Sequence, residues 1–125
     1  MTAGWWPAFL VAAAIGAPAR YLLDGWVQER RGGDFPMGTL VVNLVGCLAL
    51  GVVTGLGIHH GLAGEARAAL GSGGLGAFTT FSAVSFETVR LVEVGDARAA
   101  ARNVLAQGLG GLLAAAAGLA VAALG

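Results

Sequence analysis

Residues 76–87 read Gly-Ala-Phe-Thr-Thr-Phe-Ser-Ala-Val-Ser-Phe-Glu, and this stretch decides how the chain is interpreted. It places hydroxyl groups, phenyl rings and one carboxylate inside a segment that is otherwise hydrocarbon. Carrying hydroxyls and a carboxylate into a bilayer-length helix is unfavourable unless something polar must pass there. The stretch therefore predicts the lining of a pore.

The same residues allow a plainer interpretation. Phe78, Phe81 and Phe86 would then be packing residues, and the hydroxyl groups would bond back to carbonyls of their own helix. Composition by itself favours this plainer interpretation, so other parts of the chain have to decide between the two.

The composition indicates a membrane protein. Of the 125 residues, 57% are hydrophobic and only 11% are charged, and the mean hydropathy is +0.79. Soluble domains carry about 25% charged residues, so a soluble bundle is the less economical alternative. The formal net charge is zero, and without a basic run we expect no nucleic-acid partner. The 22 glycines suit helices that pack closely in lipid.

Four apolar segments follow one another, each close to the ~20 residues that cross a hydrocarbon core. They span residues 5–23, 37–58, 68–91 and 103–124. We therefore predict an all-α membrane protein with four transmembrane helices, forming one domain over residues 1–125. No basic residue precedes the first apolar segment, so we expect no cleavable signal.

A run of glycines at residues 71–76 predicts that the third helix is broken. Glycine costs about 1 kcal/mol relative to alanine inside a helix. Broken helices at membrane depth use their freed carbonyls to hold cations.

The arginines predict an orientation in the cell membrane. Five of the seven lie in or beside the linkers at residues 28–34 and 92–102, whereas the linker at residues 59–67 holds one. Because arginine-rich loops stay in the cytoplasm, we expect both termini outside.

Polar residues at helical spacing are candidate ion ligands. Thr39 and Asn43 share one face of the second segment, and the Asn43 amide offers two donors to an anion. The alternative is that Asn43 hydrogen-bonds a neighbouring helix. Thr80 and Ser82 supply hydroxyl donors, and Phe81 presents an electropositive ring edge. Together these groups could replace the hydration of a small anion.

Ionisable residues suggest pairings rather than catalysis. Arg20 and Asp24, one turn apart, could form an ion pair, and Glu87 is expected near an interface or paired with Arg20 or Arg90. Cys47 is expected to be a small buried side chain. With no nucleophile–base pair or metal-ligand cluster in view, we do not expect an enzyme.

Three motifs resemble the Fluc/CrcB fluoride channels. They are residues 16–21 (Gly-Ala-Pro-Ala-Arg-Tyr), 36–46 (Pro-Met-Gly-Thr-Leu-Val-Val-Asn-Leu-Val-Gly) and 76–82 (Gly-Ala-Phe-Thr-Thr-Phe-Ser). The resemblance covers three of the four segments in the right order.

This resemblance implies an antiparallel, dual-topology type of dimer with two pores, each lined by both subunits. It would conduct fluoride passively out of the cell, driven by about 2.3 kcal/mol per charge per 100 mV, and so lower fluoride toxicity. A structural sodium ion would be held by backbone carbonyls matching Gly76 and Thr79. The implied fluoride pathway and vestibule residues are Asn43 and Phe81, with Thr39, Thr80 and Ser82 nearby, and Arg20 at the vestibule.

Two departures from the family pattern lead to a hypothesis about assembly. Val84 stands where the family has a second phenyl ring, and Asn103 and Gln107 stand where its fourth helix carries Tyr and Ser. These changes could alter or close one pore. Since the arginine bias also favours a single orientation, the chain could be one half of a heterodimer with an oppositely oriented homologue.

Two other functions remain open. A small multidrug-resistance type of transporter has the same size and helix number, but it needs an acid within the first helix, and Asp24 lies near that helix's end. A non-conducting interaction protein would use the polar stretch for packing against a partner in the lipid.

Overall fold

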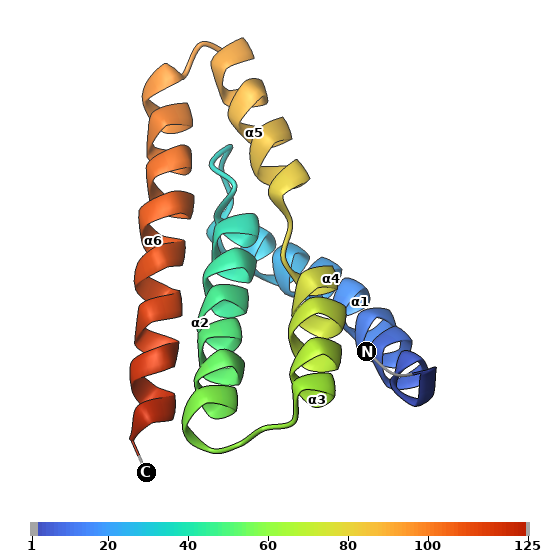
Figure 1. Ribbon diagram of the computed structural model, residues 1–125. Coiled ribbons are helices and arrows are strands. Elements are labelled where there is room, and N and C mark those ends of the chain that lie inside the picture. Colours follow the sequence, from blue (N-terminus) through green and yellow to red (C-terminus); the bar gives the residue numbers. More distant parts are fainter. Residues whose placement is uncertain (1–2, 125) are drawn as a thin grey trace.

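The computed structural model describes residues 3–124, and that range is built of helices without strands. In chain order the helices are η1 (Ala3–Trp5), α1 (Trp6–Arg31), α2 (Met37–His59), α3 (Gly64–Ala68), the π-helical η2 (Ala69–Leu75), α4 (Gly76–Phe78), α5 (Phe81–Glu93) and α6 (Ala97–Ala123). α3, η2 and α4 continue one another as a single rod, and α5 departs from it at an angle (Figure 1). Within residues 3–124, three helical stretches are long and apolar enough to cross a membrane: Ala3–Arg31, Met37–His59 and Ala97–Ala123.

Two helices extend further than their apolar segments, so much of the predicted linkers is helical. α1 continues to Arg31 because Arg and Glu are good helix formers in water, and it ends where Gly32 and Gly33 adopt φ of 64° and 77°. α6 begins at Ala97, since the Asp96 carboxylate accepts a hydrogen bond from the Ala99 N–H at 3.0 Å and caps the helix.

The glycine run at residues 71–76 stays helical, contrary to the predicted position of the break. The helix is interrupted instead at Thr79 and Thr80, whose backbones are extended. The glycines serve close packing, because a Cβ on Gly73 would lie 2.8 Å from the Phe9 carbonyl oxygen of α1. Small residues thus bring η2 against α1.

α2 and α6 lie side by side along most of their lengths (Figure 1). Their backbones nearly touch, since a Cβ on Gly118 would overlap the Leu48 carbonyl oxygen and lie 2.8 Å from the Val52 nitrogen. Cys47 lies at this interface but is half-buried rather than fully buried, with its Sγ beside Gly111.

Few large side chains are buried within the chain. The largest side chains with almost no exposure are Val42, Asn103 and Thr39, and two of these three are polar. Many leucines are open to the surroundings; Leu112 and Leu113 on α6, for example, are 71% and 72% exposed. The interior is thus defined by polar contacts and glycine packing, and the apolar surface is left for lipid or a partner.

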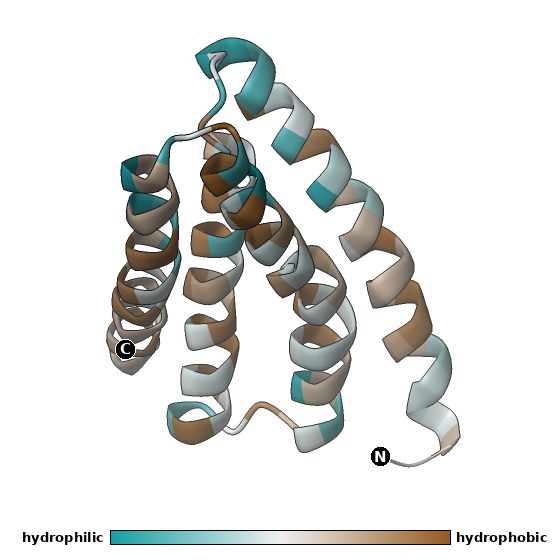
Figure 2. Ribbon diagram, turned by 90° about the horizontal axis from the view of Figure 1, so that it is seen from above, coloured by the Kyte–Doolittle hydropathy of each residue, from teal (hydrophilic) through white to brown (hydrophobic). Residues whose placement is uncertain are grey.

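The two loops that follow α1 and α5, which are flanked by the arginines of the adjoining helix ends, lie toward the same end of the molecule. The loop at residues 94–96 is at the top of Figure 1, the loop at residues 32–36 lies below it in the upper half, and the loop at residues 60–63 is at the opposite end. Hydrophilic colouring gathers on the last turns of α1, next to the loop at residues 32–36 (Figure 2). Phe35 packs there against Leu91, Ala99 and Ala100.

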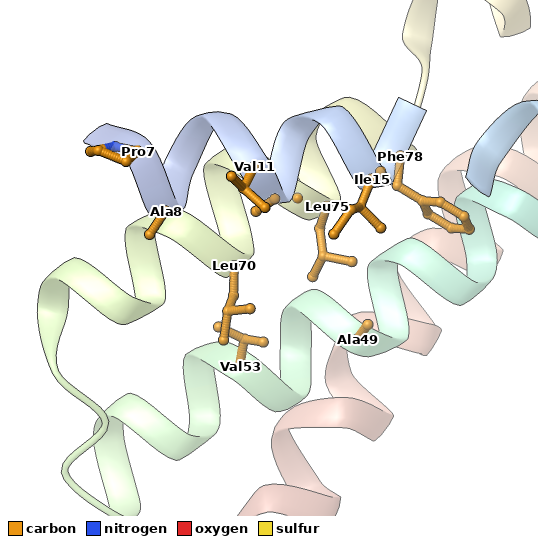
Figure 3. Close-up of a pocket in the computed structure, with 12 residues that line it drawn as sticks. Pro7, Ala8, Val11, Ile15, Ala49, Val53, Leu70, Leu75 and Phe78 are labelled. Atoms are coloured by element: carbon orange, nitrogen blue, oxygen red, sulfur yellow. The ribbon is translucent and has the colours of Figure 1, made fainter. Parts of the chain in front are cut away.

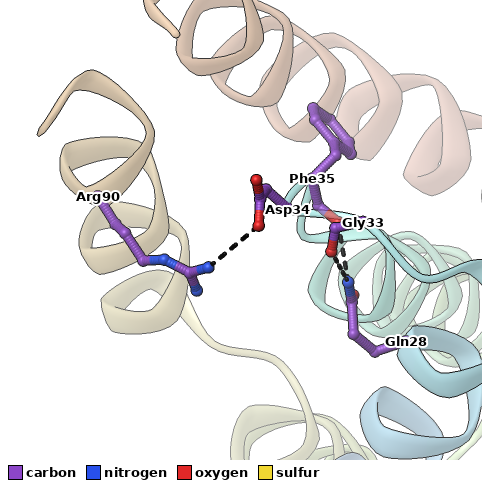
Figure 4. A network of polar contacts seen from close by, with 5 residues as sticks. All are labelled: Gln28, Gly33, Asp34, Phe35 and Arg90. Carbon is purple, nitrogen blue, oxygen red and sulfur yellow. Dashed lines mark hydrogen bonds and ion pairs between the residues drawn. The ribbon is translucent and has the colours of Figure 1, made fainter. Parts of the chain in front are cut away.

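Gln28 ties the loop after α1 to the start of α2. Its Nε2 donates to the carbonyls of Gly33 and Phe35 at 3.2 and 3.1 Å (Figure 4). Its Oε1 accepts from the Gly38 N–H at 3.1 Å. The same view includes an ion pair between Arg90 and Asp34 at 3.8 Å.

The Gln28 hydrogen bonds should contribute more to the free energy of unfolding than the ion pair between Arg90 and Asp34. The Arg90 and Asp34 side chains are 53% and 84% exposed, so Asp34→Asn should change the free energy of unfolding by less than about 0.5 kcal/mol. Gln28→Ala removes three hydrogen bonds to backbone and should cost about 2 kcal/mol. Denaturation in mixed micelles measures both, and equal effects would contradict this ranking.

Candidate functional site

The interruption between α4 and α5 is held in place by Asn43 of α2. The Asn43 Nδ2 donates to the Thr80 carbonyl at 3.0 Å, and the Asn43 Oδ1 accepts from the Thr80 N–H at 2.9 Å. One amide side chain therefore satisfies both backbone groups of a residue in extended conformation. Asn43 therefore bonds a neighbouring segment of the chain, close to the alternative in which its amide hydrogen-bonds a neighbouring helix.

This clamp frees two backbone carbonyls. In an unbroken helix the Gly76 carbonyl would accept from the Thr80 N–H, and the Thr79 carbonyl from the Ala83 N–H. Here the Thr80 N–H donates to Asn43, and the Ala83 N–H donates to the Thr80 Oγ1 at 3.2 Å. The helix donors of both carbonyl oxygens are thus used elsewhere, and Gly76 is exposed at the surface of the chain.

A ladder of side-chain amides extends from Asn43 along α6. Asn43 also donates to the Gln107 Oε1 at 3.0 Å, and the Gln107 Nε2 reaches the Asn103 Oδ1 at 3.5 Å. Asn103 is fully buried and donates to the Thr88 Oγ1 at 2.9 Å. These contacts were not predicted from the sequence. Polar residues one turn apart on an otherwise apolar helix were the signal that could have found them.

Beside the ladder lies a groove of about 640 Å³. Its walls come from α2, the interruption, α5 and α6, and it is lined by Asn43, Thr79, Thr80, Phe81, Val84, Ser85, Thr88, Val89, Val104, Gln107 and Gly108. Phe81 is 83% exposed here, whereas Val84, which stands where the family pattern has a second phenyl ring, is buried. The groove is where the candidate ligands Asn43, Thr80 and Phe81 come together.

The hydroxyl groups divide into two kinds. Ser85 donates to the Phe81 carbonyl at 3.1 Å and Thr79 to the Leu75 carbonyl at 3.0 Å, as the plainer interpretation requires. Thr80 and Ser82 instead face each other with their oxygens 3.2 Å apart at the start of α5, and this pair is exposed. Of these two residues, Thr80 lines the groove and its hydroxyl also accepts from the Ala83 N–H, whereas Ser82 lies outside the groove lining.

Thr39 lies away from the groove, buried against Glu87 of α5. Its Oγ1 donates to the Glu87 Oε1 at 2.9 Å. The predicted pairing of Glu87 with Arg20 or Arg90 is wrong for the described residues, because neither arginine comes within 4.0 Å of it. Arg90, near the end of α5, reaches the Asp34 loop, whereas Glu87 lies one turn deeper and faces α2.

The suggested ion pair between Arg20 and Asp24 is also absent from residues 3–124. The Asp24 carboxylate turns toward α2 and lies against Gly38. The Arg20 Nε is buried without a hydrogen-bond partner in the same range. Arg20 therefore keeps a donor atom that no contact among these residues satisfies.

A second hollow, of about 700 Å³, lies between α1, α2 and the rod of α3, η2 and α4. The side chains that line it are apolar, including Val11 and Ile15 of α1, Val53 of α2, and Leu70 and Phe78 (Figure 3). It offers no polar side chain to an ion, so the groove beside Asn43 is the better candidate site.

These features define a helical, multi-pass membrane protein whose polar site is built around an interrupted helix. The profile of the family described as "CrcB-like protein, Camphor Resistance (CrcB)" matches residues 8–119, and the chain belongs to this family. The resemblance inferred from the sequence motifs is thereby confirmed.

Several relatives carry the name of a fluoride channel. The chain is 49% identical to "Fluoride-specific ion channel FluC 1" of Symbiobacterium thermophilum, over 93% of this chain and 95% of the relative. It is 42% identical to the FluC 1 protein of Streptomyces avermitilis, over 91% and 92%. The FluC 2 protein of Cutibacterium acnes is 39% identical, over 89% and 91%.

Proposed function

We propose that this chain is a subunit of a fluoride-selective passive channel that lets cytoplasmic fluoride leave the cell and so lowers its toxicity. The observation that carries the proposal is the near-complete alignment, at 49% identity, with a relative named as a fluoride-specific ion channel. The groove beside the interruption supplies the chemistry, because it gathers amide and hydroxyl groups next to an exposed phenyl ring.

The groups of the site take separate roles in this proposal. Thr80 and Ser82 offer hydroxyl donors, and Phe81 offers its electropositive ring edge to the anion. Asn43 supplies the side-chain amide of the pathway, and Thr39 lies one turn before it on the same helix, outside the groove. Arg20, with its buried and unpaired Nε, attracts the anion at the vestibule.

The assembly we propose is an antiparallel dimer of four-span subunits with both termini outside. Residues 64–93 form the third span as a broken helix, completing the three unbroken ones. On α5, Phe81 and Phe86 are 83% and 70% exposed within one chain, which supports a second subunit against this face. Five arginines at one end support the orientation.

A sodium ion fits the carbonyls of Gly76 and Thr79. Both have lost their helix donors, and carbonyl oxygens of interrupted helices suit Na⁺. Two oxygens from one chain are fewer than a hard cation requires, so the proposed ion would lie between two subunits and help hold them together.

The heterodimer hypothesis concerns which chain is the second subunit. Val84 lines the groove at the position where the family has a second phenyl ring, so that ring is missing from the groove of this chain. Relatives named FluC 1 and FluC 2 are both among the matches, and such numbering is consistent with paired subunits.

Fluoride efflux from liposomes tests the function and the assembly. A fluoride-selective electrode should record fast, passive, fluoride-selective release when the chain is reconstituted with a homologous partner of opposite orientation. A proton-coupled transporter would need an imposed proton gradient, and an interaction protein would give no release in any combination. Robust efflux from liposomes that contain this chain alone would overturn the heterodimer hypothesis while supporting the channel.

A further inference from the structure

Both hydrogens of the Asn43 side-chain nitrogen are already used inside the subunit. A primary amide nitrogen carries two donors. One is directed to the Thr80 carbonyl and the other to the Gln107 Oε1, each at 3.0 Å. An anion in the groove can therefore receive a hydrogen bond from Asn43 only if one of these two acceptors leaves.

The two acceptors differ in how easily they can leave. The Thr80 carbonyl is part of the backbone, and the same residue is also held through its N–H, so its departure would dismantle the interruption. Gln107 holds Asn43 through a flexible side chain. Its other contact, to the Asn103 Oδ1, is long at 3.5 Å and therefore weak.

Gln107 also has space into which it can move. It is half-buried and lines the groove of about 640 Å³ beside Phe81. Asn103, by contrast, is fully buried and bonded to Thr88. Among the amides of the ladder, Gln107 is the one that can swing away without breaking the fold.

We propose that Gln107 acts as a displaceable gate in the anion pathway. Its amide oxygen occupies the Asn43 donor in the absence of an anion, and a small anion must displace it to bind there. Because hydrogen bonds to a charged acceptor are stronger than those to a neutral one, a compact anion wins this exchange. The inference rests on the proposed function and adds to it a residue that sets how much fluoride is needed for entry.

Substitutions at Gln107 that differ in the acceptor test the gate. Gln107→Met keeps the length of the side chain but has no amide oxygen, and it should raise the apparent fluoride affinity about fivefold, the factor that one net hydrogen bond is worth. Gln107→Glu provides a charged acceptor and should lower the affinity. Leu105→Met, at an exposed position of α6, is the matched control and should behave as the unaltered chain.

Two measurements read the outcome. One is the ¹⁵N–¹H signal of the Asn43 side chain in detergent during titration with sodium fluoride, with sodium chloride as the anion control. The other is fluoride efflux at graded fluoride concentrations from liposomes that contain each variant together with the homologous partner. The gate predicts that the Asn43 signal responds at lower fluoride concentration in Gln107→Met than in the unaltered chain, and that efflux saturates earlier.

The results also separate this inference from the proposed function. If fluoride shifts the Asn43 signal equally in the unaltered chain, Gln107→Met and a second variant, Gln107→Ser, the gate is overturned and the channel stands. If fluoride neither shifts the signal in any variant nor passes through liposomes, both are overturned. The thermal unfolding midpoint of each variant shows that the comparison is made between folded proteins.

Discussion

Changing Asn43 to Asp should reduce fluoride efflux about 100-fold. This factor corresponds to about 2.7 kcal/mol, in the upper part of the range of free energies for hydrogen bonds to charged groups. Asp has the same shape and keeps the oxygen that accepts from the Thr80 N–H. It replaces the nitrogen, however, so that an oxygen would face the Thr80 carbonyl and the Gln107 Oε1, both now 3.0 Å from that nitrogen. The ionised carboxylate of the Asn43→Asp variant would also repel an incoming anion.

The same change should weaken the fold. Two acceptors lose their donor, and each buried acceptor left unpaired costs about 1–3 kcal/mol. We expect the free energy of unfolding to fall by about 3 kcal/mol, with α5 free to move relative to α4. Denaturation in mixed micelles and the fluoride electrode measure the two effects on the same preparation.

A control on the same helix separates the site from general damage. Thr54→Val alters a half-buried polar residue of α2 outside the groove, and it should leave efflux unchanged. If Asn43→Asp conducts as well as Thr54→Val, Asn43 has no part in the fluoride pathway. If it conducts poorly but is as stable as the unaltered chain, the clamp on Thr80 contributes little to folding.

Adding one methyl group at Gly118 should strongly destabilise the packing of α2 on α6. A Cβ at this position would overlap the Leu48 carbonyl oxygen, lie 2.8 Å from the Val52 nitrogen and lie 3.0 Å from the Gly51 carbonyl carbon. These are backbone atoms, so no side-chain rotation can relieve the overlap. α2 and α6 would have to separate, and Gly118→Ala should cost about 3 kcal/mol or prevent folding.

Gly25→Ala is the matched control for Gly118→Ala. Gly25 also lies inside a long helix, but a Cβ there would meet no atom within 4 Å. Its replacement should be neutral or stabilising by up to ~1 kcal/mol, because alanine favours helix. Thermal unfolding in detergent compares the pair, and similar midpoints for both variants would contradict the close packing of α2 on α6.

Much of the architecture follows from local sequence. The apolar segments at residues 37–58 and 103–124 predicted the positions of α2 and α6 to within a few residues, except where α6 starts at the cap provided by Asp96. Lipid allows a backbone to satisfy its hydrogen bonds only within a helix or a closed barrel. Length and hydrophobicity therefore suffice to place such helices without knowledge of their neighbours.

The interruption illustrates where local reasoning stops. The glycine run was expected to break the helix, yet those residues remain helical because they pack against α1. The break occurs at Thr79 and Thr80, where Asn43 on another helix supplies substitute hydrogen bonds. A helix opens where its backbone groups find other partners, and such partners come from elsewhere in the chain.

The sequence by itself determined the membrane class, the long helices and the family, because hydrophobic length and motif spacing are local properties. Tertiary structure alone decided that Asn43 clamps Thr80, that Gln107 accepts from Asn43, and that Glu87 meets Thr39 rather than an arginine. Each of these pairs joins segments that lie far apart in the sequence. Which pairs form depends on how the helices are rotated and how closely glycines let them approach, and no single segment of sequence specifies that geometry.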